Sequence, residues 1–201
     1  MAAMSARTDE SQFVCSMIDS LFIAQDRRPD HLCDIDVAAL SDFERGLLVI
    51  VGLVTQFIEA YKMEPIQIHQ LRQESRRLNQ DEPWLEVSAG EEVIARHVIL
   101  KGARSESLYL HGETIIVGER LPRAVRRDLY ESSMGLGQIL RHRRVEMHGE
   151  LLWCGTENVT RVQDLSDSRA NHPTINKTYR LICDGSPSIL ITERFPPPLR
   201  H

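Results

Sequence analysis

Residues 188–195, Ser-Ile-Leu-Ile-Thr-Glu-Arg-Phe, have the alternating pattern of an extended strand. Every second side chain of a β-strand lies on the same face, so Glu193 shares a face with Ile189, Ile191 and Phe195. A carboxylate on an apolar face is unfavourable unless it is paired or bound to a ligand. The stretch therefore predicts a core strand whose acid requires a partner.

A second strand pattern carries the opposite charge in the same unusual position. In residues 92–100, Glu-Val-Ile-Ala-Arg-His-Val-Ile-Leu, Arg96 is in phase with Ile94, Val98 and Leu100. An acid and an arginine inside one cavity would suit a small anionic substrate. Two structural interpretations compete with that site. Arg96 and Glu193 could be a buried ion pair, or the strand could lie at a sheet edge with that face in water.

The order of the remaining patterns predicts the fold class. Helical spacing is followed by strands, then by two helices, then by strands joined through short hairpins. This order favours an α+β fold, with a mostly antiparallel sheet, over a doubly wound parallel sheet. The expected helices are 11–24, 41–61, 121–130 and 135–142, and the expected strands are 66–72, 91–101, 107–117, 144–155, 176–183 and 188–195. We expect one domain over residues 1–201, with 1–10 disordered.

The helix expected at 41–61 begins with a capping box, Ser41-Asp-Phe-Glu44. Its residues are apolar on most sides, which predicts deep burial. Pro65 prevents the helix from continuing, and residues 76–83 are charged and typical of a turn. A cavity between such helices and the sheet would receive Arg96 and Glu193.

Composition excludes several classes of protein. The formal net charge of −5 argues against general nucleic-acid binding, so an anionic ligand must be met by local arginines. The most apolar run, 46–58, is too short to span a bilayer. The cysteines are scattered without a CxxC pair, as expected for a reduced cytoplasmic protein, at Cys15, Cys33, Cys154 and Cys183. We expect a monomer or homodimer that binds a small molecule and neither nucleic acid nor membrane.

Motifs for metals and cofactors are absent. The eight histidines show no HxxxH or HxH spacing, and neither a phosphate loop nor a dinucleotide fingerprint occurs. Gly135-Leu-Gly137 precedes a short predicted helix and is typical of a flexible turn that could cover a pocket. The arginines between 123 and 144 are typical of a solvated helix face or an oligomer contact, with anion steering as the minor alternative.

Four segments together resemble the chorismate pyruvate-lyase family, and more closely its actinobacterial-type 4-hydroxybenzoate synthases. The resemblance covers residues from about 41 to 195. It rests on the order and spacing of four segments, which are residues 94–102, 119–122, 135–137 and 179–195. It implies a six-stranded antiparallel sheet with helices packed on it. It also implies cleavage of chorismate to 4-hydroxybenzoate and pyruvate without a metal or organic cofactor.

The resemblance assigns roles residue by residue. Arg96 matches the arginine that binds the ring carboxylate, and Glu193 matches the glutamate near the oxygen that becomes the phenol. Glu193 could then donate a proton as the ether bond breaks. Leu136 matches a leucine that closes the pocket, and Val54 stands where many members have methionine. Arg180 is a weaker candidate for the pyruvyl carboxylate, because its strand position points it outward.

Two departures from the family pattern bear on the substrate. Gly135 replaces the usual proline before Leu136. Val54 replaces the usual methionine and would enlarge the pocket by about one or two heavy atoms. The alternatives are an enzyme of secondary metabolism acting on another anionic aromatic or polyketide-like compound, or a non-catalytic aromatic-acid binding protein. Retention of both Arg96 and Glu193 favours chemistry, since binding alone has no evident need for the acid.

Overall fold

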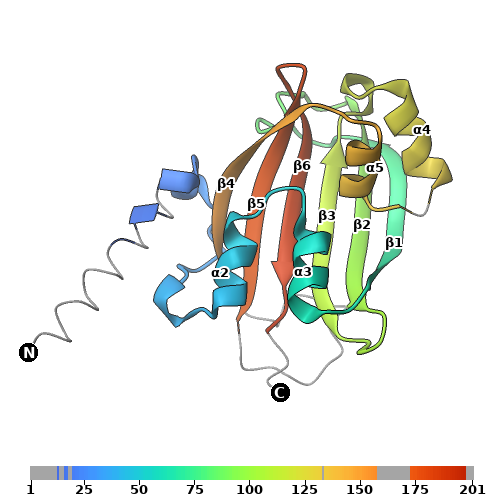
Figure 1. The fold of residues 1–201 in the computed structure, drawn as a ribbon. Coiled ribbons are helices and arrows are strands. Elements are labelled where there is room, and N and C mark those ends of the chain that lie inside the picture. The colour runs from blue at the N-terminus through green and yellow to red at the C-terminus, as the bar shows by residue number, and fades with distance from the viewer. Residues whose placement is uncertain (1–12, 14–15, 18–19, 133, 158–172, 198–201) are drawn as a thin grey trace, which may run out of the picture.

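The computed structural model describes residues 13, 16–17, 20–132, 134–157 and 173–197 (Figure 1). Its centre is a six-stranded antiparallel sheet in the order β1-β2-β3-β6-β5-β4. The predicted α+β class is confirmed, whereas residues 1–10 lie outside the described part. The elements are η1 (Gln25–Arg27), η2 (Val37–Ala39), α2 (Asp42–Val49), α3 (Val54–Lys62), β1 (Ile66–Arg77), β2 (Glu92–Gly102), β3 (Leu108–Ile116), η3 (Gly118–Arg120), α4 (Arg123–Glu131), α5 (Leu136–His142), β4 (Met147–Glu157), β5 (Thr174–Cys183) and β6 (Ser186–Phe195).

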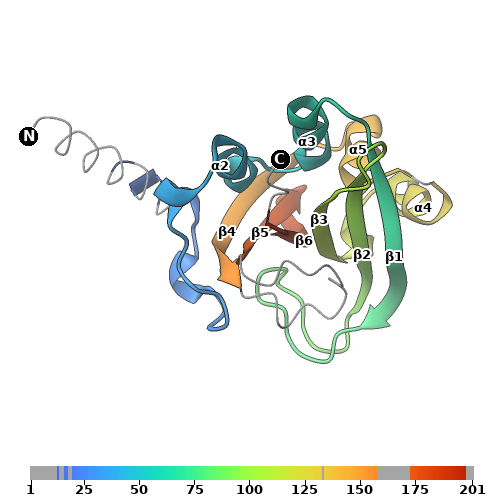
Figure 2. The same ribbon diagram turned by 90° about the horizontal axis from the view of Figure 1, so that it is seen from below.

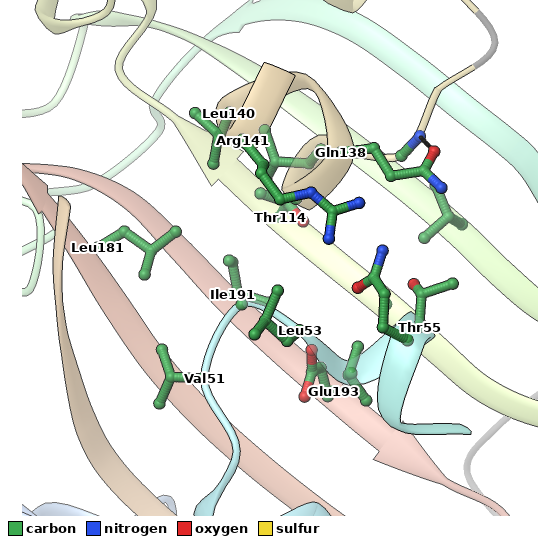
Figure 3. A pocket seen from close by; sticks show the side chains of 18 of the residues that line it. Val51, Leu53, Thr55, Thr114, Gln138, Leu140, Arg141, Leu181, Ile191 and Glu193 are labelled. Atoms are coloured by element: carbon green, nitrogen blue, oxygen red, sulfur yellow. Dashed lines mark hydrogen bonds between the residues drawn. The ribbon is translucent and has the colours of Figure 1, made fainter. Parts of the chain in front are cut away.

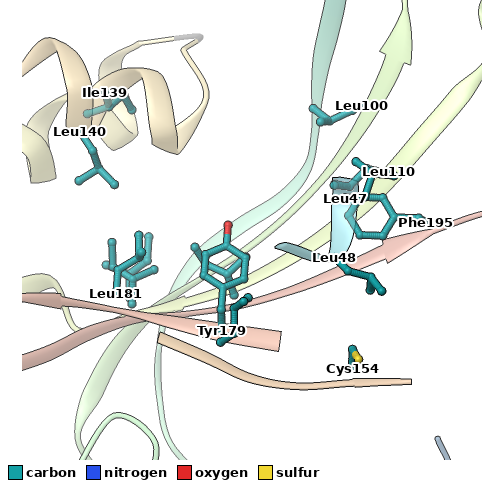
Figure 4. Close-up of a cluster of buried hydrophobic side chains, with 14 of the residues drawn as sticks. Leu47, Leu48, Leu100, Leu110, Ile139, Leu140, Cys154, Tyr179, Leu181 and Phe195 are labelled. Carbon is teal, nitrogen blue, oxygen red and sulfur yellow. The ribbon is translucent and has the colours of Figure 1, made fainter. Parts of the chain in front are cut away.

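Both faces of the sheet are covered, but by different structures. Helices α2, α3, α4 and α5 pack on one face, and the segment between β1 and β2 covers the other (Figure 2). The core between helices and sheet joins side chains from α2, α5, β5 and β6 (Figure 4), among them Leu48, Ile139, Leu181 and Phe195. The N-terminal segment protects the β4 edge, where the Ile23 N–H donates to the Leu151 carbonyl.

Two rows of cross-strand neighbours run across the middle of the helix-covered face. The first row consists of Val98, Gly112, Glu193 and Lys177, taken in order from β2 to β5. The second row consists of Arg96, Thr114, Ile191 and Tyr179 in the same order. Arg96 and Glu193 therefore lie on one face of the sheet, as the alternation predicts, but on strands that are separated by β3.

The single helix predicted at 41–61 is wrong, because two helices, α2 and α3, occupy this stretch. Between them Gly52 adopts φ +75°, a left-handed conformation that would strain other residues. The carbonyls of Leu47 and Ile50, left free where α2 ends, accept hydrogen bonds from the Lys177 ammonium. The break thus depends on a residue more than 120 positions away in the sequence, which local patterning does not reveal.

Other differences from the predicted elements are smaller. The helical stretch is less buried than expected, since Leu53 is 46% exposed and Tyr61 53% exposed. Strand β1 continues through Arg77, so the predicted turn starts later than residue 76. In the described part of the chain, no helix combines the length and apolar character needed to cross a membrane.

Candidate functional site

A cavity of about 500 Å³ lies between the sheet and the segments that cover it. Its floor is built by β2, β3, β5 and β6, and its roof by residues 51–56 and helix α5 (Figure 3). Apolar side chains such as Leu181 and Ile191 make up much of the lining, and a few polar groups converge on it. This combination of size and lining is typical of a small-molecule site.

Arg96 brings an unsatisfied positive charge into this cavity. Its side chain is only 3% exposed, and its Nη2 makes one long hydrogen bond, 3.4 Å, to the Met134 carbonyl. Within the described residues, its Nε and Nη1 have no hydrogen-bond partner. Burial lowers the pKa of the guanidinium. A buried guanidinium with open donors is suited to a carboxylate, which it can bind through two parallel hydrogen bonds.

Glu193, also 3% exposed, is held by two neighbours on β5. The Tyr179 hydroxyl donates to Oε1 at 3.0 Å, and the Lys177 ammonium lies 2.9 Å from Oε2. Burial, the adjacent carboxylate and this hydrogen bond raise the pKa of Tyr179 well above its usual value, so the phenol remains a donor. The carboxylate therefore faces a cation and a donor, and each of its oxygens retains capacity to accept from a ligand.

Neither structural interpretation of the two charges agrees with this geometry. Glu193 forms its ion pair with Lys177, so the interpretation as an Arg96–Glu193 pair is wrong. Strand β6 lies between β3 and β5, so the wet edge strand is wrong as well. What the structure brings together is one cavity with an unpaired cation and a paired acid in its lining.

The roof contains three of the residues that the sequence singled out. Val54, Gly135 and Leu136 all line the cavity. A side chain at Gly135 would bring its Cβ within 2.5 Å of the Ile68 Cδ1. The Gly135 N–H also donates to the Gln138 Oε1 at 3.3 Å, a bond that proline could not make. The departure from proline is therefore matched by local packing and by this hydrogen bond.

Arg180 does not line the cavity. Its Nε lies 2.7 Å from the Glu150 Oε2, and its Nη1 donates to the Trp84 carbonyl at 3.1 Å, on the sheet face opposite the helices. The prediction that Arg180 binds a second carboxylate in the cavity is therefore wrong. Arg141 on α5 does reach the cavity, beside Gln138, and its guanidinium pairs with no other described side chain (Figure 3).

Several polar residues of the site were not predicted from the sequence. Thr114, Gln138 and Tyr179 line the cavity, Lys177 contacts Glu193 from the neighbouring strand on the same face, and the lining also includes Arg141, one of the arginines for which a solvated face was expected. A signal for Lys177 was present, since it is in phase with Ile175, Tyr179 and Leu181 on its strand, as Glu193 is with the apolar residues of β6. Across the described ranges, no three His, Cys, Asp or Glu side chains gather in a way that could hold a metal ion.

A family model described as "Chorismate pyruvate-lyase Rv2949c-like" matches residues 48–201. The chain belongs to this family. Among curated relatives, the chorismate pyruvate-lyase of Mycobacterium tuberculosis (strain ATCC 25618 / H37Rv) is 26% identical over 171 residues, which cover 82% of this chain and 84% of that protein. The chorismate pyruvate-lyase of Mycobacterium leprae (strain TN) is 26% identical over 157 residues, covering 76% and 74%.

Solved structures share the fold at much lower identity. PhnF from Mycobacterium smegmatis aligns with a TM-score of 0.55 and 14% identity, over 73% of this chain and 64% of PhnF. The ligand-binding domain of a putative GntR-family transcriptional regulator from Bordetella bronchiseptica aligns with a TM-score of 0.53 and 16% identity, over 68% and 88%. These similarities show the chorismate-lyase-like fold alone.

Proposed function

We propose that this protein is a chorismate pyruvate-lyase that forms 4-hydroxybenzoate and pyruvate without a cofactor. Besides membership of the family, one structural observation supports this proposal. One apolar cavity is lined by a buried, unpaired Arg96 and, on another strand, by Glu193, whose carboxylate accepts a hydrogen bond from Tyr179 and forms an ion pair with Lys177.

Arg96 would bind the ring carboxylate of the substrate. The open Nε and Nη1 can donate to its two oxygens, and exclusion of water strengthens such charge-assisted bonds. The apolar lining then surrounds the ring, which becomes aromatic in the reaction. Binding energy from these contacts would orient the ring toward Glu193.

The reaction balances within the substrate. The bond between the ring and the ether oxygen breaks, and the neighbouring ring carbon, which bears the hydroxyl, loses a hydrogen. The electrons of that C–H bond complete the aromatic ring, and the enolpyruvyl fragment gains a proton at its methylene carbon to become pyruvate. No oxidant or reductant is needed.

Glu193 is better placed to accept than to donate in this reaction. Its Oε1 accepts a hydrogen bond from the Tyr179 hydroxyl, and its Oε2 faces the Lys177 ammonium, so both oxygens already act as acceptors of positive partners. It would accept a hydrogen bond from the ring hydroxyl and increase electron density at the carbon that loses hydrogen. This proposed role differs from that of proton donor, which was expected from the sequence.

Arg141 and Gln138 would bind the second carboxylate, which belongs to the enolpyruvyl group. They reach in from α5, on the side of the cavity opposite Glu193 (Figure 3). Because Arg141 is exposed at the rim, it can meet the anion as it enters. The product 4-hydroxybenzoate lacks this second carboxylate and would lose the contact.

The test is incubation of purified protein with chorismate in the presence of a chelator, following pyruvate and the aromatic product. We expect both to appear in equal amounts, with the hydroxyl para to the carboxylate. If pyruvate forms no faster than in the protein-free control, the lyase proposal fails. Val54 would then direct the search toward a bulkier anionic ring compound, because its small side chain widens the roof.

A further inference from the structure

Lys177 is a fully buried lysine to which the proposed reaction assigns no contact with the substrate. Its side chain is 0% exposed, although lysine is almost never completely buried unless it is paired. It projects from β5 onto the helix-covered face, beside its cross-strand neighbour Glu193. It is not among the residues that line the cavity, so it acts through another group.

Three acceptors surround the Lys177 ammonium. The carbonyls of Leu47 and Ile50 both lie at 2.7 Å, and the Glu193 Oε2 lies at 2.9 Å. The two carbonyls accept hydrogen bonds from the ammonium, whereas the contact with Oε2 is an ion pair that lacks hydrogen-bond geometry. Two hydrogen bonds and one ion pair together offset the unfavourable burial of the charge.

The same ammonium joins the floor of the cavity to its roof. The two carbonyls belong to the C-terminal end of α2, where a positive charge is favourable. The next residues, 51–54, lie in the cavity lining. One group therefore contacts both the acid on the floor and the backbone that leads into the roof.

Two contacts on two different oxygens, a hydrogen bond and an ion pair, restrict the orientation of the Glu193 carboxylate. With the Tyr179 hydrogen bond alone, Oε1 would be held while the carboxylate could still turn about that contact. The positive charge of Lys177, 2.9 Å from Oε2, opposes this rotation. We propose that Lys177 is a positioning residue that orients Glu193 and thereby sets recognition of the para hydroxyl of an aromatic acid. This proposal rests on the proposed function.

The test compares two ligands that differ only in that hydroxyl, 4-hydroxybenzoate and benzoate. By calorimetry, the wild-type protein should favour 4-hydroxybenzoate by about 10- to 100-fold, the range for a hydrogen bond to a charged group. Lys177→Met should reduce this preference to about threefold or less. Affinity for benzoate, which depends on Arg96, should change by less than about threefold.

Thr178→Val is the matched control on the same strand. Thr178 is buried, but its hydroxyl pairs with the Thr192 hydroxyl, at 3.0 Å, outside the cavity lining. This variant also converts a buried polar residue of β5 to an apolar one. It should keep the full preference for the hydroxylated ligand, so a general weakening of β5 would be recognised.

The outcomes separate the two proposals. If wild type converts chorismate and Lys177→Met keeps the wild-type preference, the positioning role is overturned while the lyase function stands. If wild type neither discriminates between the ligands nor converts chorismate, both proposals are overturned. If Lys177→Met does not fold, Lys177→Arg is the deciding variant, because its forked guanidinium displaces the positive charge. The preference of this variant for 4-hydroxybenzoate over benzoate should drop at least about threefold. An unchanged preference would overturn the positioning role.

Discussion

Arg96 and Glu193 reach the same cavity from strands that do not touch, because both β2 and β6 pair with β3 between them. Arg96 is opposite Thr114, and Glu193 is opposite Gly112. With strands about 4.8 Å apart and about 3.4 Å per residue, two strands and two residues separate their Cα atoms by about 12 Å. This spacing leaves room for a ring between the two side chains.

Removal of the Arg96 charge should separate binding from stability. Arg96→Met should weaken 4-hydroxybenzoate binding by about 2–5 kcal/mol, because a ligand carboxylate loses its buried partner. The melting temperature should hold or rise, since an unpaired buried guanidinium is replaced by an apolar chain. Arg96→Lys should restore only part of the affinity, because a point charge replaces a fork. Calorimetry that finds unchanged affinity in Arg96→Met would remove Arg96 from the site.

Glu193→Gln should lower turnover by about 10²-fold or more, because a neutral amide is a much weaker acceptor than a carboxylate. The amide oxygen can still accept from Lys177, so the free energy of unfolding should fall by only about 1–3 kcal/mol. Turnover and denaturant unfolding are to be measured on one preparation. Near-normal turnover in a folded variant would contradict the catalytic role.

Arg141 should matter for the substrate and not for the product. Arg141→Gln should raise the KM for chorismate by about tenfold, as expected for loss of one charge-assisted hydrogen bond, while 4-hydroxybenzoate binds as before. Arg144→Gln is the control, because Arg144 is an exposed arginine close in sequence that does not line the cavity. Equal effects of both variants would indicate general electrostatic steering in place of a contact.

Gly135→Ala should disturb the roof through one neighbour. The new methyl would meet the Ile68 Cδ1 at 2.5 Å, so Ile68, which also lines the cavity, must move. Because the clashing atom is the far end of a half-buried side chain, this shift should cost only about 0.5–1.5 kcal/mol, and we expect slightly weaker product binding and a slightly lower melting temperature. Ile68→Val removes the clashing atom and should restore both in the double variant. A double variant no better than Gly135→Ala would show that the clash is not the cause.

Glu64 should stabilise the fold in a defined range of pH. Hydrogen bonds from the hydroxyls of Tyr109 and Ser105 lower its pKa from 4.5 to about 2. A lowered pKa means that its contribution is fully present above pH 4.5 and is lost as the pH falls toward about 2. Glu64→Gln should therefore reduce the melting temperature at pH 7, with the difference from wild type shrinking below pH 4.5.

The control for Glu64 is Glu106→Gln, an exposed acid in the neighbouring turn. That variant should follow the wild-type melting curve across the same pH range. A difference between wild type and Glu64→Gln that stays constant down to pH 2 would assign the effect to packing and not to the charge.

Alternation along single strands was enough to determine much of this protein. The pattern around Arg96 and around Glu193 correctly placed both on buried faces, because a strand's side-chain period of two is a local property. Turn residues and short connections likewise predicted the hairpins and the antiparallel sheet. The family resemblance, carried by motif order and spacing, is confirmed by the family model.

Which groups these charged side chains contact was decided only by the tertiary structure. The position of β6 between β3 and β5 gave Glu193 the lysine and tyrosine of β5 as neighbours and kept it from Arg96. The Lys177 ammonium also binds the carbonyls at the end of α2, just before the break between α2 and α3. The helical pattern of residues 41–61 did not predict this break. Periodicity determines the face on which a side chain lies, whereas its partners depend on strand order and register, which arise from contacts between distant segments.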